Sequence, residues 1–302
     1  MKLYKYQGAG NDFLIADNRD GSISLSAGQI AALCDRRYGV GADGLMLLDA
    51  PERIPESCGG TPCGSEVDFC MTYYNSDGSG GMMCGNGGRC IVAFAADMGI
   101  GNFRFLAADG FHVARILSSE GREKVISLQM KDVSICHYHE GLTGTAVPSD
   151  GYFLDTGTRH FVRIVQDLDH YDVVGEGRDI RYHAEELLPV GANVNFVEPS
   201  SDGVLKVRTY EKGVEDETFA CGTGIVASCI AAYRAGIRPT EIFQEGTSVR
   251  YEVQAKRDRL GVTFRPSAMS GRVAEDVYLT GPATFVAEIE AMTDNQINCV
   301  YL

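Results

Sequence analysis

The sequence predicts an α+β fold of two pseudo-symmetric domains that descend from an internal duplication. A Cys-Gly-x-Gly motif opens an apolar helix at Cys84, and the same motif opens a second apolar helix at Cys221. Other landmarks recur in the same order at a period of roughly 140–150 residues, which is domain-sized rather than typical of a solenoid. Most other segments read as short strands. We therefore expect each domain to be a curved, mostly antiparallel sheet wrapped around a central apolar helix, with the active site in the interdomain cleft.

The length and the charge of the chain limit its possible functions. At 302 residues it is long enough for two domains with sizeable cores. Its net charge of −14 and pI near 4.9 argue against binding to nucleic acid or to anionic membrane surfaces. No apolar run approaches the roughly 20 residues of a membrane helix, and the first residues lack the apolar core of a signal peptide. We expect a cytoplasmic protein with its ten cysteines reduced.

One cysteine-containing segment lies outside the repeated pattern. Cys58 and Cys63, with Cys70 nearby, have a loose metal-like spacing. No second close pair of ligands accompanies them, and His137-x-His139 is distant in the sequence. We interpret the segment as an inserted surface loop and predict no metal site.

The first half reads as strands around one apolar helix. Turn residues at 8–12 separate a first strand from a buried strand, and Ser26 is a suitable N-cap for a helix that ends near Arg37. The Cys84 helix ends at Gly99, since glycine readily adopts the left-handed conformation after a helix. Its apolar residues leave little polar face, which predicts burial on nearly all sides. Strands are expected at 13–16, 45–48, 67–74, 103–116 and 124–130, with turns at 75–78 and 108–110.

The second half repeats this order from about residue 150. A strand, a turn and another strand precede a helix around residues 175–183. The segment 190–197 echoes the segment 40–47, and the Cys221 helix runs to Gly236. Strands are expected at 152–155, 161–165, 195–197, 204–210, 248–254, 259–264 and 277–279.

The paired helix starts indicate chemistry at a carbon next to a carboxylate. Backbone N–H groups at a helix N-terminus favour anions and can lower the pKa of a cysteine. Two such ends that converge on one carboxylate would bind it, and would stabilise the charge that forms when the neighbouring C–H loses its proton. A thiolate on one face of that carbon and a thiol on the other would invert its stereochemistry.

A structural role for these cysteines is the simplest alternative. A single cysteine is commonly a small buried core residue. The recurrence of the glycines and the helix favours function, because a core residue has no reason to repeat its flanking sequence. Redox pairs usually share one Cys-x-x-Cys segment, and metal sites need more ligands, so both fit less well.

Further motifs accompany the two Cys-Gly-x-Gly turns. They are Gly10-Asn11-Asp12-Phe13, Tyr74-Asn75-Ser76-Asp77-Gly78, His160, Asn193, Glu211, Ala220-Cys221-Gly222-Thr223-Gly224 and Leu279-Thr280-Gly281-Pro282-Ala283. With these motifs the chain resembles the diaminopimelate epimerase family nearly from end to end. The resemblance implies that the last strand returns to the first domain, so that the domains are residues 1–123 with 279–302, and residues 124–278. It also implies cofactor-independent conversion of LL- to meso-2,6-diaminopimelate in lysine and peptidoglycan precursor synthesis.

The resemblance implies roles for individual residues. Cys84 and Cys221 would be the acid–base pair, the first called the donor and the second the acceptor, with His160 and Glu211 assisting. The groups around the reacting carboxylate would be Gly85, Asn86, Gly222 and Thr223. The substrate-orienting set would be Asn11, Asn75, Thr158, Asn193, Glu211 and Lys212. Tyr278 resembles a dimer-contact tyrosine, so the resemblance implies a homodimer.

The chain departs from the family pattern at the residues that would hold the far end of the substrate. Many members have Asn-Pro where this chain has Thr158-Arg159, and arginine is commoner than Lys212. Gly44 stands where some members have glutamine. Lysine lacks the two-pronged grip of arginine on a carboxylate, so either Lys212 or Arg159 is a candidate for the distal carboxylate.

Alternatives remain open from the sequence. A proline racemase or hydroxyproline epimerase would share the fold and would act on a ring amino acid. A non-catalytic amino-acid-binding protein would need the helix ends but neither thiol. Asn11 and Asn75 also suit turns, and a histidine such as His160 is in isolation more often a packed residue than a catalyst.

Overall fold

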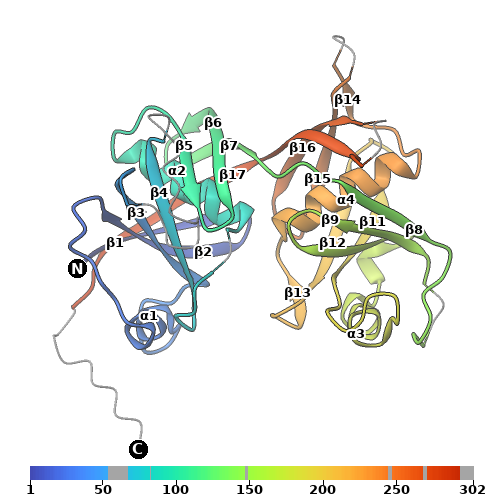
Figure 1. Ribbon diagram of the computed structural model, residues 1–302, viewed down its shortest axis with the longest axis horizontal. Coiled ribbons are helices and arrows are strands. Elements are labelled where there is room, and N and C mark those ends of the chain that lie inside the picture. Colours follow the sequence, from blue (N-terminus) through green and yellow to red (C-terminus); the bar gives the residue numbers. More distant parts are fainter. Residues whose placement is uncertain (54–66, 82, 147–148, 244–246, 268–270, 293–302) are drawn as a thin grey trace, which may run out of the picture. The chain divides into compact units, whose positions relative to one another are not determined.

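The computed structural model describes residues 1–53, 67–81, 83–146, 149–243, 247–267 and 271–292. The chain divides into two compact units, Met1–Leu128 with Pro282–Leu302, and Gln129–Gly281 (Figure 1). The boundaries expected from the sequence, after residues 123 and 278, fall slightly before these. The segment with Cys58 and Cys63 lies outside the described residues, as do residues 293–302.

The first unit is a sheet that closes on itself. Its elements are β1 (Lys2–Gly8), β2 (Asn11–Asn18), α1 (Ala27–Cys34), β3 (Gly44–Asp49), β4 (Phe69–Asn75), α2 (Gly85–Asp97), β5 (Arg104–Ala107), β6 (Gly110–Glu120), β7 (Glu123–Gln129) and the second part of β17 (Ala274–Glu290). Neighbouring strands pair in the order β1 to β7, and β17 pairs with both β7 and β1. These pairings form a barrel.

Helix α2 is buried in this unit. It lies against β1, β2, β3 and β6, and every residue from Gly85 to Ala95 is buried. Gly99 follows the helix with φ of +85°, in the left-handed conformation that the sequence predicts. Helix α1 begins with the predicted N-cap Ser26, in a capping box with Gln29, but it ends at Cys34 rather than near Arg37. The chain leaves the helix there because Asp35 is extended and its carboxylate accepts the N–H groups of Arg37 and Tyr38.

The second unit uses the same kinds of element. They are β8 (Ile135–His139), β9 (Gly151–Asp155), β10 (Arg159–Ile164), η3 (Leu168–His170), α3 (Val173–His183), β11 (Asn193–Pro199), β12 (Leu205–Glu211), β13 (Asp216–Thr218), α4 (Gly222–Arg234), β14 (Glu241–Ile242), β15 (Val249–Gln254), β16 (Arg259–Pro266) and the first part of β17. Helix α4 lies against β9, β10, β11, β12 and β16. A separate apolar cluster packs beneath α3 and includes Phe161, Ile180 and Phe196.

The order of elements recurs between the units. The succession β1-β2-α1-β3-β4-α2 returns as β9-β10-α3-β11-β12-α4, with η3 and β13 added. The pairing directions return as well, since the first pair is antiparallel, the second parallel and the third antiparallel in both units. Each Cys-Gly-x-Gly helix therefore follows the same four-stranded arrangement.

Strand β17 corrects the sequence prediction, which placed a strand only at residues 277–279. The strand runs on through Gly281 and Pro282, residues that normally end a strand. Its first part pairs with β16 as far as Thr280, and its second part pairs with β1 from Thr284. Pro282 lies between these two ladders.

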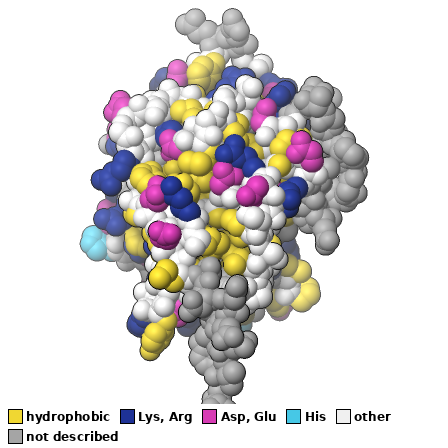
Figure 2. Space-filling view, turned by 90° about the vertical axis from the view of Figure 1, so that its left-hand side faces the viewer, with side chains coloured by type: hydrophobic (Ala, Val, Ile, Leu, Met, Phe, Trp, Pro, Cys, Tyr) yellow, Lys and Arg dark blue, Asp and Glu magenta, His cyan; other side chains and the backbone are white. Residues whose placement is uncertain are grey.

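The short strands β8, β13 and β14 were also absent from the prediction. Among the described residues, no helix combines the length and apolar character needed to span a membrane. Acidic and basic side chains are interspersed with hydrophobic ones on the face shown in Figure 2.

Candidate active site

Both motif cysteines stand immediately before a helix. Cys84 is the N-cap of α2 and Cys221 is the N-cap of α4, both with extended backbone conformation. Cys221 is 8% exposed, and Cys84 is half-buried. Neither first turn contains an acidic residue, and the first N–H groups of any helix lack partners within the helix. Each helix start therefore combines a thiol with a dipole end that favours an anion.

Four other described cysteines have thiols whose pKa is raised. Burial raises the pKa of Cys34 and of Cys136 to about 11, and it also raises the pKa of Cys90 and of Cys229. These four thiols therefore stay protonated at neutral pH, and a protonated thiol is a poor base. The seven cysteines of the described ranges are thiols in the structure.

In the second unit, His160 is connected to Cys221 through hydroxyl groups. The imidazole is fully buried, and its Nε2 lies 2.9 Å from Thr158 Oγ1 and 3.0 Å from Thr223 Oγ1. The Thr223 hydroxyl oxygen in turn lies 3.5 Å from the sulfur of Cys221. Burial lowers the pKa of His160 to about 3, so the ring is neutral at neutral pH.

Asn193 and Glu211 belong to the same side of this sheet. Side chains two residues apart on a strand share a face, so Asn193 lies with Asn195, and Glu211 lies with Thr209. The Thr209 hydroxyl donates to Asn195 Oδ1 at 2.9 Å, and Asn195 Nδ2 lies 3.1 Å from His160 Nδ1. The face toward α4 therefore gathers the histidine, both asparagines and the glutamate.

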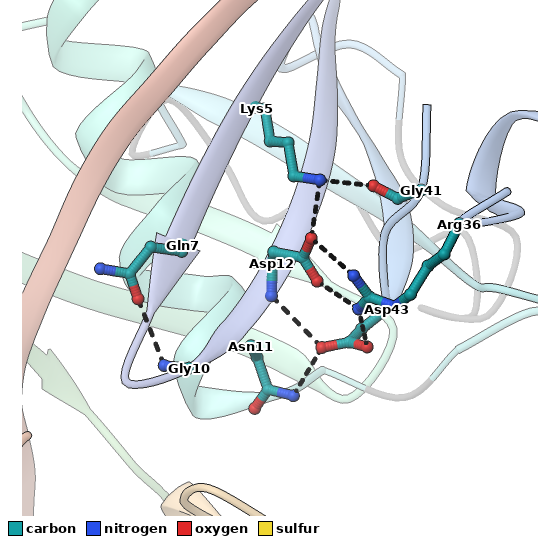
Figure 3. Close-up of polar contacts among 8 residues, drawn as sticks. All are labelled: Lys5, Gln7, Gly10, Asn11, Asp12, Arg36, Gly41 and Asp43. Carbon is teal, nitrogen blue, oxygen red and sulfur yellow. Dashed lines mark hydrogen bonds and ion pairs between the residues drawn. The ribbon is translucent and has the colours of Figure 1, made fainter. Parts of the chain in front are cut away.

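In the first unit, Asn11 and Asn86 form a hydrogen-bonded pair. Asn86 Nδ2 donates to Asn11 Oδ1 at 2.6 Å. Figure 3 shows the next contact, in which Asn11 Nδ2 donates to Asp43 Oδ2 at 3.0 Å. Arg89, which is fully buried, donates from Nη2 to Asn86 Oδ1 at 2.8 Å and from Nη1 to the carbonyl of Gly85 at 3.2 Å. A buried guanidinium thus holds the first turn of α2.

Charged side chains support the Asp43 end of this chain. Asp12 accepts from Lys5 and from Arg36, and Arg36 also pairs with Asp43 at 2.7 Å (Figure 3). The backbone N–H of Asp12 donates to Asp43 as well. The position of Asn11 is therefore fixed by Asn86 on one side and by Asp43 on the other.

The remaining predicted binding residues lie in turns and at strand ends. Asn75 ends β4, and its amide donates to Ser79 Oγ at 3.0 Å within the turn that follows. The side-chain oxygen of Asn193 accepts the Lys212 N–H at 2.9 Å, and its amide donates to the Arg159 carbonyl. The Lys212 side chain is exposed.

Arg159 is directed away from the His160 face. Its guanidinium lies 5.0 Å from the centre of the Phe153 ring, a cation–π contact on the α3 side of the sheet. Alternation along β10 puts its side chain opposite to that of His160. Of the two residues that could bind the distal carboxylate of the substrate, Lys212 is therefore favoured, because its side chain is exposed.

Three residues of these networks were missed in the sequence: Asn195, Arg89 and Asp43. Asn195 could have been found from the period-two pattern of its strand, since it shares a face with Asn193. Arg89 is the only charged residue in the first two turns of an otherwise apolar helix. Within the described ranges, no group of three or more histidine, cysteine or acidic side chains could hold a metal ion.

The sequence has many relatives of one kind. The model of the diaminopimelate epimerase family matches residues 3–145 and 152–264. A protein of Flavobacterium psychrophilum named diaminopimelate epimerase is 40% identical over 291 residues, covering 95% of this chain and 99% of the relative. Proteins with the same name from Chlorobaculum tepidum and Aquifex aeolicus are 39% and 40% identical, covering 92% and 78% of this chain and 96% and 83% of their own.

Solved structures share the fold at low identity. A PhzF-family phenazine biosynthesis protein of Bacillus anthracis superposes with a TM-score of 0.68 and 14% identity, covering 97% of this chain and 99% of that chain. A probable proline racemase of Agrobacterium radiobacter gives a TM-score of 0.66 and 15% identity, covering 97% and 93%. These structures support a two-domain, sheet-rich α+β fold with few helices.

Proposed function

Because the chain belongs to the diaminopimelate epimerase family, we propose that it interconverts LL- and meso-2,6-diaminopimelate by moving a proton between two thiols, Cys84 and Cys221. The observation that carries the proposal is the pair of N-cap cysteines, each before a 13-residue helix with a glycine next to it. No other cysteine of the described ranges has this setting.

The chemistry follows from what each helix start can do. The reacting carboxylate of the substrate accepts N–H groups from Gly85, Asn86, Gly222 and Thr223 at the two helix starts. One cysteine, as thiolate, removes the proton from the α-carbon, and the negative charge spreads onto that carboxylate. The other cysteine, as thiol, delivers its proton to the opposite face. The stereocentre is inverted and the two thiols exchange protonation states.

The other predicted residues assist in this scheme. His160 and Glu211 support the thiols, and Asn11, Asn75, Thr158 and Asn193 orient the substrate. Lys212 is the residue we assign to the distal carboxylate, with Glu211 beside it. The scheme requires no pyridoxal phosphate and no metal.

The architecture we propose for this chemistry is a duplicated one. Each unit is a curved sheet around its own apolar helix, and the two helix starts serve one substrate carbon from the cleft between the units. We further propose a cytoplasmic homodimer with Tyr278 at its contact, acting in lysine and peptidoglycan precursor synthesis. The recurrence of element order and of pairing directions supports the duplication.

The direct test is an assay with reduced, purified protein and LL-diaminopimelate in the absence of pyridoxal phosphate. We expect the meso isomer to accumulate until both isomers are present at equilibrium. L-Proline and trans-4-hydroxy-L-proline serve as competing substrates in parallel reactions. Inversion of either ring amino acid without formation of meso-diaminopimelate would contradict the proposal.

A further inference from the structure

The buried imidazole of His160 has a definite set of neighbours on both nitrogens. On one side, Nδ1 lies 3.1 Å from Asn195 Nδ2. On the other, Nε2 lies near two hydroxyl oxygens, those of Thr158 and Thr223. Which nitrogen carries the proton decides whether the ring can accept a proton from the thiol side or can only donate a hydrogen bond toward it.

The orientation of the Asn195 amide follows from its neighbours. The same side-chain atom that faces His160 Nδ1 also lies 3.2 Å from the carbonyl oxygen of Phe161. A carbonyl can only accept, so this atom must be the amide nitrogen and not the oxygen. The amide oxygen then accepts the hydroxyl of Thr209, as the 2.9 Å distance indicates. The nitrogen and the oxygen of the Asn195 side-chain amide are therefore distinguished by their hydrogen-bond partners.

This orientation determines the tautomer of His160. Since Asn195 Nδ2 donates to Nδ1, that nitrogen carries no proton, and a neutral ring must carry its proton on Nε2. The Nε2–H then donates toward the hydroxyls of Thr158 and Thr223. Thr223, having accepted, can direct its own hydroxyl proton toward Cys221 Sγ, 3.5 Å away.

We propose that Asn195 is a positioning residue that locks His160 as a neutral hydrogen-bond donor, which acts through Thr223 to stabilise the thiolate form of Cys221. His160 is then not the base that deprotonates the thiol. No proton is transferred along the hydrogen bonds from Asn195 to Cys221, because each donor keeps its hydrogen atom. This inference rests on the proposed function in one respect, namely that the Cys221 thiolate takes part in the reaction.

The packing around Gly224 fits this role. A Cβ atom at Gly224 would lie 2.3 Å from Asn195 Oδ1 and 3.3 Å from both His160 Cε1 and Cys221 Cβ. The glycine of the second motif therefore leaves the space that the asparagine occupies. The corresponding glycine of the first motif, Gly87, would instead meet the flexible end of Met46, at 3.3 Å.

The test uses the full-length protein labelled with ¹⁵N in its histidines. A long-range ¹H–¹⁵N spectrum distinguishes the two neutral tautomers of histidine. The signal of His160 is the one that is missing from the spectrum of His160→Gln. We expect the wild type to show the Nε2–H tautomer for His160, and Asn195→Asp to convert it to the Nδ1–H tautomer, because a carboxylate can only accept. The Nδ1–H tautomer in the wild type would overturn the inference.

A second measurement follows the thiol itself. The rate at which iodoacetamide alkylates Cys221 at neutral pH should fall about tenfold in Asn195→Asp and in Thr223→Val, while that of Cys84 stays as in the wild type. Thr223→Ser, which keeps the hydroxyl, should restore the rate without changing the His160 tautomer. Equal Cys221 reactivity in the wild type and in Thr223→Val would contradict the relay, even if Asn195→Asp does not fold.

These measurements are independent of turnover. If the tautomer and the Cys221 reactivity behave as expected but LL-diaminopimelate is not epimerised, the proposed function fails and the role of Asn195 stands. If epimerisation is found with the Nδ1–H tautomer, the function stands and the role of Asn195 fails.

Discussion

The side-chain amide of Asn86 donates to the amide oxygen of Asn11 at 2.6 Å and so joins the first turn of α2 to the start of β2. The pair lies in a chain of fixed direction, because it begins at Arg89, which can only donate, and ends at the carboxylate of Asp43, which can only accept. The chain thus fixes the orientation of both side-chain amides.

The first prediction concerns the accepting end of this chain. Asp43→Asn can donate as well as accept, so it no longer fixes the orientation of Asn11. We expect kcat/KM for LL-diaminopimelate to fall about tenfold, mainly through a higher KM. Asp97→Asn is the matched control, since Asp97 accepts from Tyr6 and Lys124 at the other end of α2. A loss of similar size in both variants would show a general effect of destabilisation rather than of substrate orientation.

The second prediction compares glycines within helices. Gly224→Ala should lower kcat at least tenfold, because the new methyl group would displace Asn195 from His160. Gly87→Ala should have a smaller effect, since the neighbouring Met46 side chain can move. Gly28→Ala, with nothing within 4 Å of the added Cβ, should leave activity unchanged and raise stability by about 0.5–1 kcal/mol. Steady-state kinetics and urea unfolding check the three variants together, and equal kcat in Gly224→Ala and Gly28→Ala would contradict the packing argument.

Local signals were sufficient to predict the helix starts from the sequence. Ser26 was identified as an N-cap from its residue type alone, and the structure adds a capping box with Gln29. The positions of Cys84 and Cys221 before their helices follow from glycines and an apolar run. Asn195 is different, because its contacts come from strands that are far apart in the sequence. Its role depends on the register that places Thr209 opposite it.

The strands were harder to predict than the helices. Gly281 and Pro282 read as a stop signal, and only the exchange of partners from β16 to β1 explains why β17 continues through them. The strands β13 and β14 each pair with one neighbouring strand. Both are too short for an alternating pattern to be detected in the sequence. Pairing partners, rather than local propensity, set these boundaries.

The third prediction separates the two candidates for the distal carboxylate. Lys212→Ala should raise the KM for diaminopimelate up to about fivefold, the effect of losing one exposed ion pair. Arg159→Ala should change KM much less, because the Arg159 guanidinium lies over the Phe153 ring. Lys212→Arg serves as the control that keeps the charge. A large rise in KM for Arg159→Ala with normal kinetics for Lys212→Ala would reverse the assignment.

The fourth prediction is a pH dependence of stability. Burial lowers the pKa of His160 from 6.5 to about 3, so between these values the unfolded chain binds a proton that the folded chain does not. The contribution of His160 to the stability of the folded state is fully present above pH 6.5 and is lost as the pH falls toward 3. Its loss between pH 7 and pH 5 is about 2 kcal/mol.

His160→Gln should therefore lose less stability than the wild type over this interval, as measured by urea unfolding at pH 7 and pH 5. His170→Gln provides a control of opposite sign, because Asp167 raises the pKa of the exposed His170. The same decline in the wild type and in His160→Gln would mean that His160 is not buried in the neutral form.

The central claim is that Cys84 and Cys221 each serve one face of the substrate carbon. Its most direct test follows LL-diaminopimelate in heavy water, with the wild type and with Cys84→Ala and Cys221→Ala. We expect early product to carry deuterium at the inverted carbon while recovered substrate stays mostly unlabelled, since the donor thiol has exchanged with solvent and the abstracting thiol returns its own proton. Both variants should remain folded and lose inversion in both directions. Early product that keeps the original hydrogen, or a single variant with near wild-type epimerisation, would contradict the account and indicate one base acting on both faces.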